Sequence, residues 1–324
     1  MSKDDSTGHI IQSLAINITI AVVKGVAAFL TGSGSMLAEA IHSSADCANQ
    51  LLLLVGVKQG KRAPDASHPL GYGRAVYFWS FMVALLLFSG GGVFSIYEGI
   101  HKIVHPEPVE KVWLGVGILV ASLFLEGAAT ISNMREINRR RGKLAFGQYL
   151  RDTKDSDLIV VFGENSAAVL GLVFAIFALL ASWFTGDGHW DGYGSVAIGL
   201  VLVGVAVFLA REVQSLLIGE SADGAIAETI DNIVRDGVEY RRVLHLITVQ
   251  QGPGEVMVAV KLAFKEDVSG ADVCVLIDAF EAKLRAARPD VRWCFVEPDV
   301  PRDEPSAPSR VSTPSQLAIT PSGS

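Results

Sequence analysis

Apolar residues are concentrated in six long stretches within the first two thirds of the chain. Each stretch holds about 20 or more predominantly apolar residues, the length at which a helix crosses the hydrocarbon core of a bilayer. The pattern therefore predicts an α-helical membrane protein with six transmembrane helices. The predicted spans run from Ile10 to Leu30, Met36 to Val57, Tyr77 to Ile100, Val112 to Ser132, Leu158 to Phe184 and Tyr193 to Leu217.

After Leu217 the pattern becomes that of a small water-exposed domain. Residues 255–264 alternate strictly between apolar and polar positions, as a half-buried strand requires. Apolar residues have helical spacing at 225–235 and 272–287. Two further strands are predicted at 243–249 and 292–296, which gives the order αββαβ. This order predicts a two-layer α+β domain of the ferredoxin-like or metallochaperone-like kind. We expect a membrane domain at 1–218, a cytoplasmic domain at 219–298 and a disordered Pro/Ser-rich tail at 299–324.

Basic residues are distributed unevenly among the loops and set the expected orientation. The loop after the second span holds Lys58, Lys61, Arg62 and Arg74, and seven Lys or Arg residues lie between Arg135 and Lys154. The loops after the first and fifth spans hold none. Because cytoplasmic loops carry the excess of Lys and Arg, both termini are expected in the cytoplasm. The N-terminus lacks the pattern of a cleaved signal, so the first span is expected to be retained.

Composition excludes several classes of function. Half of the 324 residues are hydrophobic, the mean hydropathy is +0.39 and the net charge is -7, without a basic stripe that would bind nucleic acid. A G-x-x-x-x-G-K-[ST] nucleotide motif is missing, as is any C-x-x-C pair among the three cysteines. We therefore expect no nucleotide, no nucleic acid, no organic cofactor and no enzymatic chemistry.

Two of the predicted spans carry charged residues near their middles. In the second span, His42 and Asp46 are four residues apart and share one face of a helix. An imidazole and a carboxylate directed at one point are ligands that zinc accepts, although a structural hydrogen bond between them is the alternative. In the fifth span, Glu164 and Asn165 interrupt an apolar run. Buried acids on two spans favour a shared polar site on a substrate pathway.

Other polar residues inside the predicted spans are weaker candidates. Lys24 in the first span either neutralises a carboxylate or extends to the lipid headgroups. Glu126 in the fourth span either relays protons or hydrogen-bonds a neighbour. We place neither residue among the metal ligands.

These motifs together resemble the cation diffusion facilitator family. The second span and its approach, residues 32–50, read GSGSMLAEAIHSSADCANQ, and the following loop contains HPLGYGR at 68–74. The fifth span contains ENSAAVLG at 164–171, which is similar to the branch of the mitochondrial zinc-transporter-9-like proteins, and DGYGS precedes the sixth span at 191–195. The resemblance extends from residue 10 to about residue 298.

The resemblance implies divalent-metal/proton antiport by homodimers, with zinc as the leading substrate. Relatives with a full transport site have two ligands per span, four residues apart, and His42 and Asp46 match the first pair. The fifth span departs from this pattern, because Val160 and Val161 stand one turn before Glu164 and Asn165. The expected set is therefore His42, Asp46 and Glu164, completed by Asn165 or water. Such an oxygen-rich set suits Zn²⁺ but also admits Mn²⁺, Fe²⁺ or Co²⁺.

Two further metal positions of the family are only partly present. The loop motif D-x-x-H-x-x-x-H retains Asp65 and His68, and Tyr72 replaces the third ligand, so the loop is a weaker second site. The last domain has a single histidine, His245, with Lys261 and Glu297 at positions where ligands would be expected. We therefore expect this domain to be metal-free and to dimerise by packing.

The buried His and acidic residues are compatible with other functions. The same residues would serve an exporter of Mn²⁺, Fe²⁺ or Co²⁺, or a membrane metal sensor without transport. An organic-cation/proton exchanger would also need buried acids, but aromatic walls rather than His42. With no organelle signal evident and a short N-terminus, the expected location is a prokaryotic plasma membrane.

Overall fold

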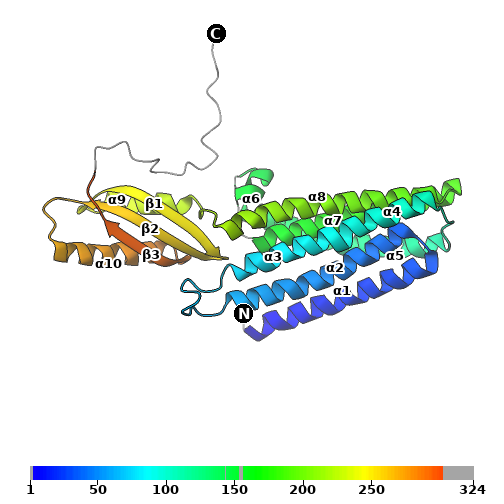
Figure 1. Ribbon diagram of the computed structural model, residues 1–324, viewed down its shortest axis with the longest axis horizontal. Helices are drawn as coiled ribbons and strands as arrows, with labels where there is room; N and C mark the ends of the chain where they lie inside the picture. The colour runs from blue at the N-terminus through cyan, green and yellow to red at the C-terminus, as the bar shows by residue number, and fades with distance from the viewer. Residues whose placement is uncertain (1–2, 143, 153–155, 302–324) are drawn as a thin grey trace, which may run out of the picture. The chain divides into compact units, whose positions relative to one another are not determined.

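The computed structural model describes residues 3–142, 144–152 and 156–301, which divide into two compact units (Figure 1). One unit comprises Met1–Arg62 and Ala75–Leu217, and the other Ala63–Arg74 and Ile218–Ser324. Lys143 and Lys154, which belong to the basic loop, lie outside the described residues. The predicted tail from 299 also lies outside them, apart from its first three residues.

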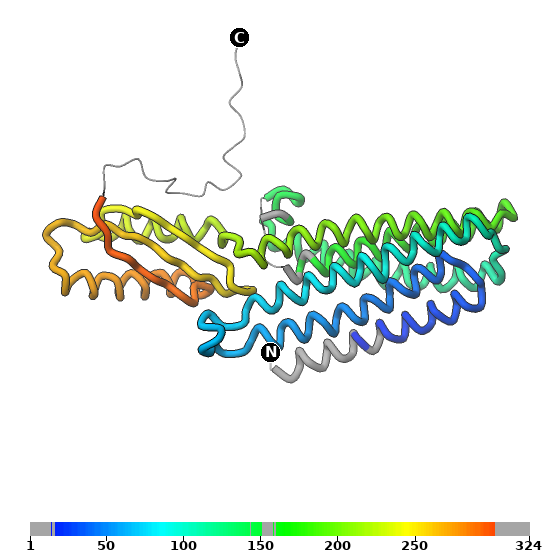
Figure 2. Tube along the Cα trace, in the orientation of Figure 1, coloured from blue at the N-terminus to red at the C-terminus, as the bar shows by residue number. Residues whose placement is uncertain are grey.

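All regular secondary structure described in the first unit is helical, and Figure 2 traces its long helices alongside one another. Four helical segments are long and apolar enough to cross a membrane within the described chain: Ala75–Val104, Val112–Arg140, Val160–Thr185 and His189–Ile218. Asn17–Thr31 is a shorter apolar segment. The elements are α1 (Lys3–Thr31), α2 (Gly34–Gly60), α3 (Ala75–Leu86), η1 (Leu87–Val93), α4 (Phe94–Val104), α5 (Val112–Arg140), α6 (Phe146–Asp152), α7 (Ser156–Thr185) and α8 (His189–Ile218).

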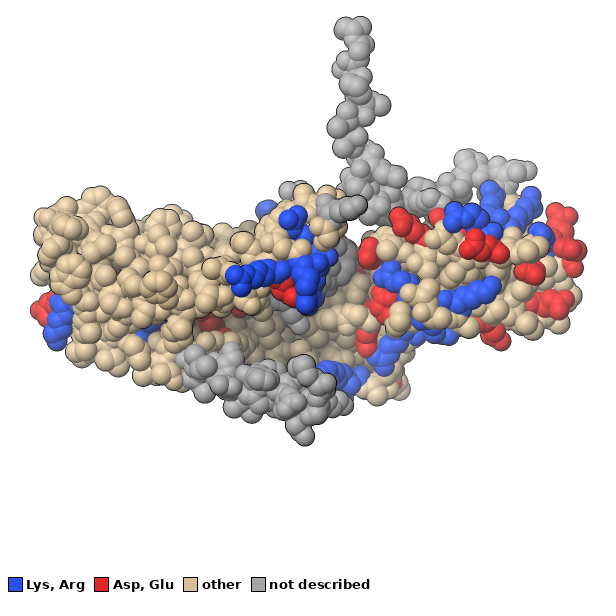
Figure 3. Space-filling model, turned by 180° about the vertical axis from the view of Figure 1, so that it is seen from behind, with Lys and Arg blue, Asp and Glu red and all other residues tan. Residues whose placement is uncertain are grey.

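The surface of the helical unit is apolar over a wide area. Phe29, Phe124 and Phe184 expose 88%, 76% and 75% of their surfaces, although such side chains are normally buried in soluble proteins. Figure 3 shows a broad part of this unit without Lys, Arg, Asp or Glu, whereas the other unit carries both signs of charge. A helical bundle with this surface is embedded in lipid, and the chain is an integral membrane protein.

The segment Ala75–Val104 contains a π-helical turn, η1, between α3 and α4. Glycines on α8, on η1 and on α4 allow α8 to approach the other two elements closely. A Cβ added at Gly99 would lie 2.6 Å from the Val196 nitrogen, and one added at Gly199 would lie 2.7 Å from the Gly92 oxygen. Helices pack at such short range in membranes where small residues line the interface.

The second unit contains a three-stranded sheet in the order β1-β2-β3. Strands β1 and β2 are antiparallel, and β2 and β3 are parallel. The predicted αββαβ order is confirmed. Its elements are α9 (Ala225–Asp236), β1 (Tyr240–Gly252), β2 (Glu255–Phe264), α10 (Gly270–Ala287) and β3 (Val291–Pro298).

Alternate residues of the sheet face opposite environments. Val258, Val260 and Leu262 of β2 are buried in a core with Ile230 of α9 and Phe280 of α10. On the other face, Ala259 pairs with Ile247 of β1 and Phe295 of β3. Phe295 exposes 56% of its surface. This face of the sheet is therefore partly apolar and open within its unit.

Candidate metal site

A stripe of polar residues follows one face of α2. Glu39, His42, Asp46 and Asn49 are separated by three, four and three residues, so their side chains project from the same side of the helix. The stripe faces α7. A Cβ at Gly171 of α7 would collide with Glu39 Oε1, and Asn49 Nδ2 donates a hydrogen bond of 2.6 Å to a carboxylate oxygen of Glu164 on α7.

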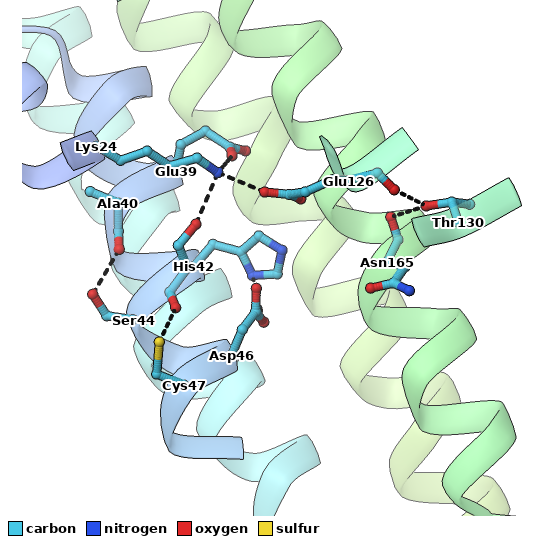
Figure 4. A network of polar contacts seen from close by, with 11 residues as sticks. Lys24, Glu39, Ala40, His42, Ser44, Asp46, Cys47, Glu126, Thr130 and Asn165 are labelled. Carbon is cyan, nitrogen blue, oxygen red and sulfur yellow. Dashed lines mark hydrogen bonds and ion pairs between the residues drawn. The ribbon is translucent and has the colours of Figure 1, made fainter. Parts of the chain in front are cut away.

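His42 and Asp46 lie together in the middle of this stripe (Figure 4). His42 Nδ1 is 3.6 Å from Asp46 Oδ1, which is an ion-pair distance rather than a hydrogen bond. The His42 side chain is fully buried, and neither of its nitrogens has a hydrogen-bond partner; Asp46 Oδ1 has none either. Buried polar atoms are normally paired, so these three atoms fit a position that receives a cation.

Glu164 lies on the same side of α7 as this pair, and Asn165 does not. Asn49, three residues after Asp46 on α2, donates to the Glu164 carboxylate, so Glu164 lies on the side of α7 that faces α2. The Thr130 hydroxyl of α5 donates to the backbone carbonyl oxygen of Asn165 at 3.3 Å, and Figure 4 shows the Asn165 side chain apart from His42 and Asp46. Consecutive helical residues point about 100° apart, so only one of the two can face α2.

The conformation does not bring the expected ligands into one coordination sphere. Among the described residues, no three His, Cys, Asp or Glu side chains are grouped closely enough to hold a metal ion. Glu164 is engaged by Asn49 rather than directed at His42. A metal bound by all three residues would therefore require a closer approach of α2 and α7.

A second polar cluster joins α1, α2 and α5 beside the pair (Figure 4). Lys24 Nζ donates to Glu39 Oε2 at 3.2 Å, to Ser43 Oγ at 2.9 Å and to Glu126 Oε1 at 3.0 Å. Of the two roles considered for Lys24, the structure shows neutralisation of carboxylates. The sequence reading missed Glu39, although its spacing of three residues from His42 places it on the same face.

Asp191 has a structural role that the sequence reading also missed. Its carboxylate accepts hydrogen bonds from Ser33 Oγ at 2.6 Å, Gly34 N at 2.5 Å and Ser35 Oγ at 2.5 Å. A buried carboxylate at the first turn of α2 satisfies free backbone donors and interacts favourably with the helix dipole. Two motifs, at residues 32–35 and 191–195, thus meet and fix the start of the helix that carries His42.

The loop residues Asp65 and His68 are adjacent but exposed. His68 Nδ1 lies 3.7 Å from Asp65 Oδ1. Asp65 already accepts hydrogen bonds from the Ser67 and His68 backbone at 2.9 and 2.8 Å and from the Tyr72 hydroxyl at 2.6 Å. The Tyr72 hydrogen bond holds the pKa of Asp65 below its usual range. A metal ion here would compete with these internal partners.

In the sheet, His245 and Glu297 both pair with Lys261 across the strands. Lys261 Nζ lies 2.8 Å from Glu297 Oε1 and 3.7 Å from Asp299 Oδ2. An ammonium group therefore stands between the histidine and the acids, where it repels a metal ion.

Comparison with known proteins identifies the family. Residues 10–218 match the model of the cation efflux transmembrane domain. The chain is 33% identical over 79% of its length to the mitochondrial proton-coupled zinc antiporter SLC30A9 of Xenopus laevis, and 30% identical over 79% to that of Homo sapiens. It is 30% identical over 69% of its length to metal tolerance protein C4 of Arabidopsis thaliana.

These matches cover 46%, 45% and 49% of the respective relatives, so the chain spans a little less than half the length of each. Residues 10–218, which match the family model, include both the polar stripe of α2 and Glu164 of α7. The chain belongs to the cation diffusion facilitator family, in the branch of the zinc-transporter-9-like proteins.

Proposed function

We propose that this protein exports a divalent metal cation, with Zn²⁺ the first candidate, in exchange for protons. The observation that carries the proposal is the buried pair His42–Asp46, whose facing atoms have no hydrogen-bond partner, with Glu164 on the neighbouring helix. The names of the two antiporters support zinc and protons as substrates, and the name of the metal tolerance protein supports a metal substrate.

Proton coupling follows from the chemistry of the ligands. A metal ion requires a neutral His42 and ionised Asp46 and Glu164, so metal binding releases protons from these groups. Protons entering from the opposite side then compete for the same groups and release the metal. Alternating access requires one helix group to move against another around a site near the middle of the membrane. Water is the proposed fourth ligand in this conformation. Asn165 would take its place only after a rotation of α7 that turns it away from Thr130.

The proposal includes six spans with both termini in the cytoplasm. Helix α2 has 27 residues and measures about 40 Å at 1.5 Å per residue, enough to cross a bilayer. Its polar stripe lowers its hydropathy. Helix α1 packs beside it through Lys24. We retain the membrane domain 1–218, the cytoplasmic domain 219–298 and the tail 299–324 as the proposed organisation.

The proposed host is a prokaryotic plasma membrane. The zinc antiporters among the relatives are named as mitochondrial proteins, and a mitochondrial membrane is the alternative host. The loop pair Asp65–His68 is proposed as a second and weaker metal position.

Flux into sealed vesicles tests the function directly. Purified protein in proteoliposomes should accumulate Zn²⁺ when a proton gradient is imposed, and Zn²⁺ addition should drive proton movement in the opposite direction. A metal sensor would bind Zn²⁺ without flux, and an organic-cation exchanger would move protons without Zn²⁺. A Mn²⁺, Fe²⁺ or Co²⁺ exporter would show the same coupling with a different preferred ion.

The cytoplasmic domain should fold and dimerise without metal. We propose that its open sheet face, centred on Ile247, Ala259 and Phe295, packs against a second copy, and that the Lys261 ammonium excludes a metal ion. The isolated domain, residues 219–298, should sediment as a dimer in a chelating buffer. Phe295→Asp should shift it to monomer, with Val275→Asp on α10 as an exposed apolar control. Stoichiometric Zn²⁺ binding by this domain at neutral pH would contradict the prediction.

Replacing Val160 with His should increase the preference for zinc. Val160 is fully buried and stands one turn before Glu164, whereas Val161 exposes 36% of its surface and stands one turn before Asn165. A second imidazole beside Glu164 adds a nitrogen ligand, which favours Zn²⁺ over Mn²⁺. Competitive uptake of both ions into proteoliposomes should show a zinc-to-manganese ratio raised severalfold for Val160→His. Val161→His is the matched control and should leave the ratio unchanged. An unchanged ratio in both variants would remove Glu164 from the ligand set.

A further inference from the structure

The Lys24 ammonium is surrounded by oxygen atoms in the way that a bound cation would be. Three oxygens from two different helices, those of Glu39, Ser43 and Glu126, lie 2.9–3.2 Å from Nζ. The side chains of Lys24 and Glu39 are fully buried, and that of Glu126 is 18% exposed. Figure 4 shows Nζ where the three contacts converge. Two carboxylates and a hydroxyl form a set of hard oxygen ligands, which suit Mn²⁺ or Mg²⁺.

The second carboxylate oxygen of Glu39 is also buried and lacks a hydrogen-bond partner. It lies against Gly171 of α7, where any larger side chain would collide with it. Lys24 therefore does not use all the ligating capacity of this acid. The cluster offers a cation more oxygen atoms than the ammonium engages.

The cluster continues the polar stripe that contains the candidate metal site. Glu39 and His42 are one helical turn apart on the same face of α2, and the charges of Glu39 and Glu126 both act on His42. Without Lys24, two acids would stand beside the transport site with no positive partner. A buried unpaired acid is strongly unfavourable, so such a pair would attract another cation.

We propose that Lys24 is a tethered cation that permanently occupies a second cation position between α1, α2 and α5. Its occupancy leaves the transported ion a single position, at His42 and Asp46; this part of the inference rests on the proposed function. Removing the ammonium should open a site for a divalent cation formed by Glu39, Glu126 and Ser43.

The test measures Mn²⁺ binding to the full-length protein in detergent by equilibrium dialysis. The background variant His42→Ala/Asp46→Ala, which also carries Asp65→Ala/His68→Ala to remove the weaker loop position, lacks the proposed transport site and should bind no Mn²⁺. Adding Lys24→Gln to this background should produce binding of one Mn²⁺ per chain, with an electron paramagnetic resonance spectrum of bound Mn²⁺. Lys24→Arg in the same background keeps a tethered cation and should bind none.

Matched variants locate the new ion. Adding Glu39→Gln and Glu126→Gln to the Lys24→Gln background should abolish the new binding, and Glu126→Gln alone should weaken it at least tenfold. Failure of the proposed function has a separate signature, because Zn²⁺ binding to the otherwise unaltered chain would then be insensitive to His42→Ala/Asp46→Ala.

Stability provides a second readout. In the same background, which lacks the proposed transport site, Mn²⁺ should raise the Tm of Lys24→Gln and leave that of Lys24→Gln/Glu39→Gln/Glu126→Gln unchanged. Recovery of folded Lys24→Gln only in the presence of Mn²⁺ would support the proposal. The proposal is overturned if Lys24→Gln gains neither Mn²⁺ nor Mn²⁺-dependent stability. It is equally overturned if this variant aggregates with and without Mn²⁺ while the triple variant folds.

Discussion

Asp46→Ala should reduce Zn²⁺-coupled proton flux by at least about 100-fold, because loss of an outer-shell partner of a ligand already costs 10–100-fold in metal affinity or activity. Asp46 supplies the only carboxylate on α2 that is within ion-pair distance of His42 among the described residues. Its replacement leaves His42 and Glu164 as the remaining proposed ligands, too few charged groups to extract Zn²⁺ from water. Proteoliposome flux, recorded with a zinc indicator outside and a pH indicator inside, measures the effect.

Glu136→Ala provides a matched control for this change. Glu136 is a carboxylate near the end of α5 that contacts Arg139 and Arg140 at 2.8 and 2.7 Å. Its removal should leave flux within about twofold, since surface ion pairs contribute little. Undiminished transport by a folded Asp46→Ala variant would show that α2 does not supply the metal ligands.

Asp191→Ala should destabilise the helical unit by at least about 3 kcal/mol. Hydrogen bonds to charged groups contribute about 1.5–3 kcal/mol each, and the Asp191 carboxylate accepts them from Ser33, Gly34 and Ser35. Without it, two buried hydroxyls and the first backbone donors of α2 lose their partner. The Tm in detergent should fall substantially, and transport should fall with it because α2 carries His42 and Asp46.

The neighbouring Asp187 distinguishes this role from a general loss of charge. Asp187 is exposed in the loop before α8 and contacts His189 Nδ1 at 2.5 Å. Asp187→Ala should leave the Tm nearly unchanged. Equal Tm values for Asp191→Ala and the unaltered protein would mean that the start of α2 is held by other contacts.

The sequence pattern predicts a helix or strand correctly where apolar residues recur at regular positions along it. The alternation from Val256 to Phe264 fixes which side chains of β2 face the core, and the structure has that strand and that core. Long apolar runs predicted the segments that are now seen as candidate spans. Helices α1 and α2 are harder to recognise as spans from hydropathy. The charge of Lys24 in α1 and the polar stripe from Glu39 to Asn49 in α2 lower the mean hydropathy of these helices.

The contacts between helices could not be predicted from the sequence pattern. Lys24, Glu39 and Glu126 are far apart in sequence, and their meeting depends on how three helices are rotated about their axes. The same rotation decides between Glu164, which approaches Asn49, and Asn165, which contacts Thr130. Sequence spacing predicts which residues share a face but leaves open which neighbour that face meets.

The π-helical turn at Leu87–Val93 shifts the periodicity of buried positions along the segment Ala75–Val104 by one residue. Up to Leu87, the first residue of the turn, buried residues repeat every seven positions, from Tyr77 to Ala84 and from Ser80 to Leu87. From Gly92, near the end of the turn, they do so again, from Gly92 to Gly99 and from Ser95 to Lys102. Across the turn the step is eight, since 92 minus 84 and 95 minus 87 both equal eight. The wide turn therefore contains one extra residue. A single heptad pattern extended through the whole segment would assign residues after the turn to the wrong face of the helix.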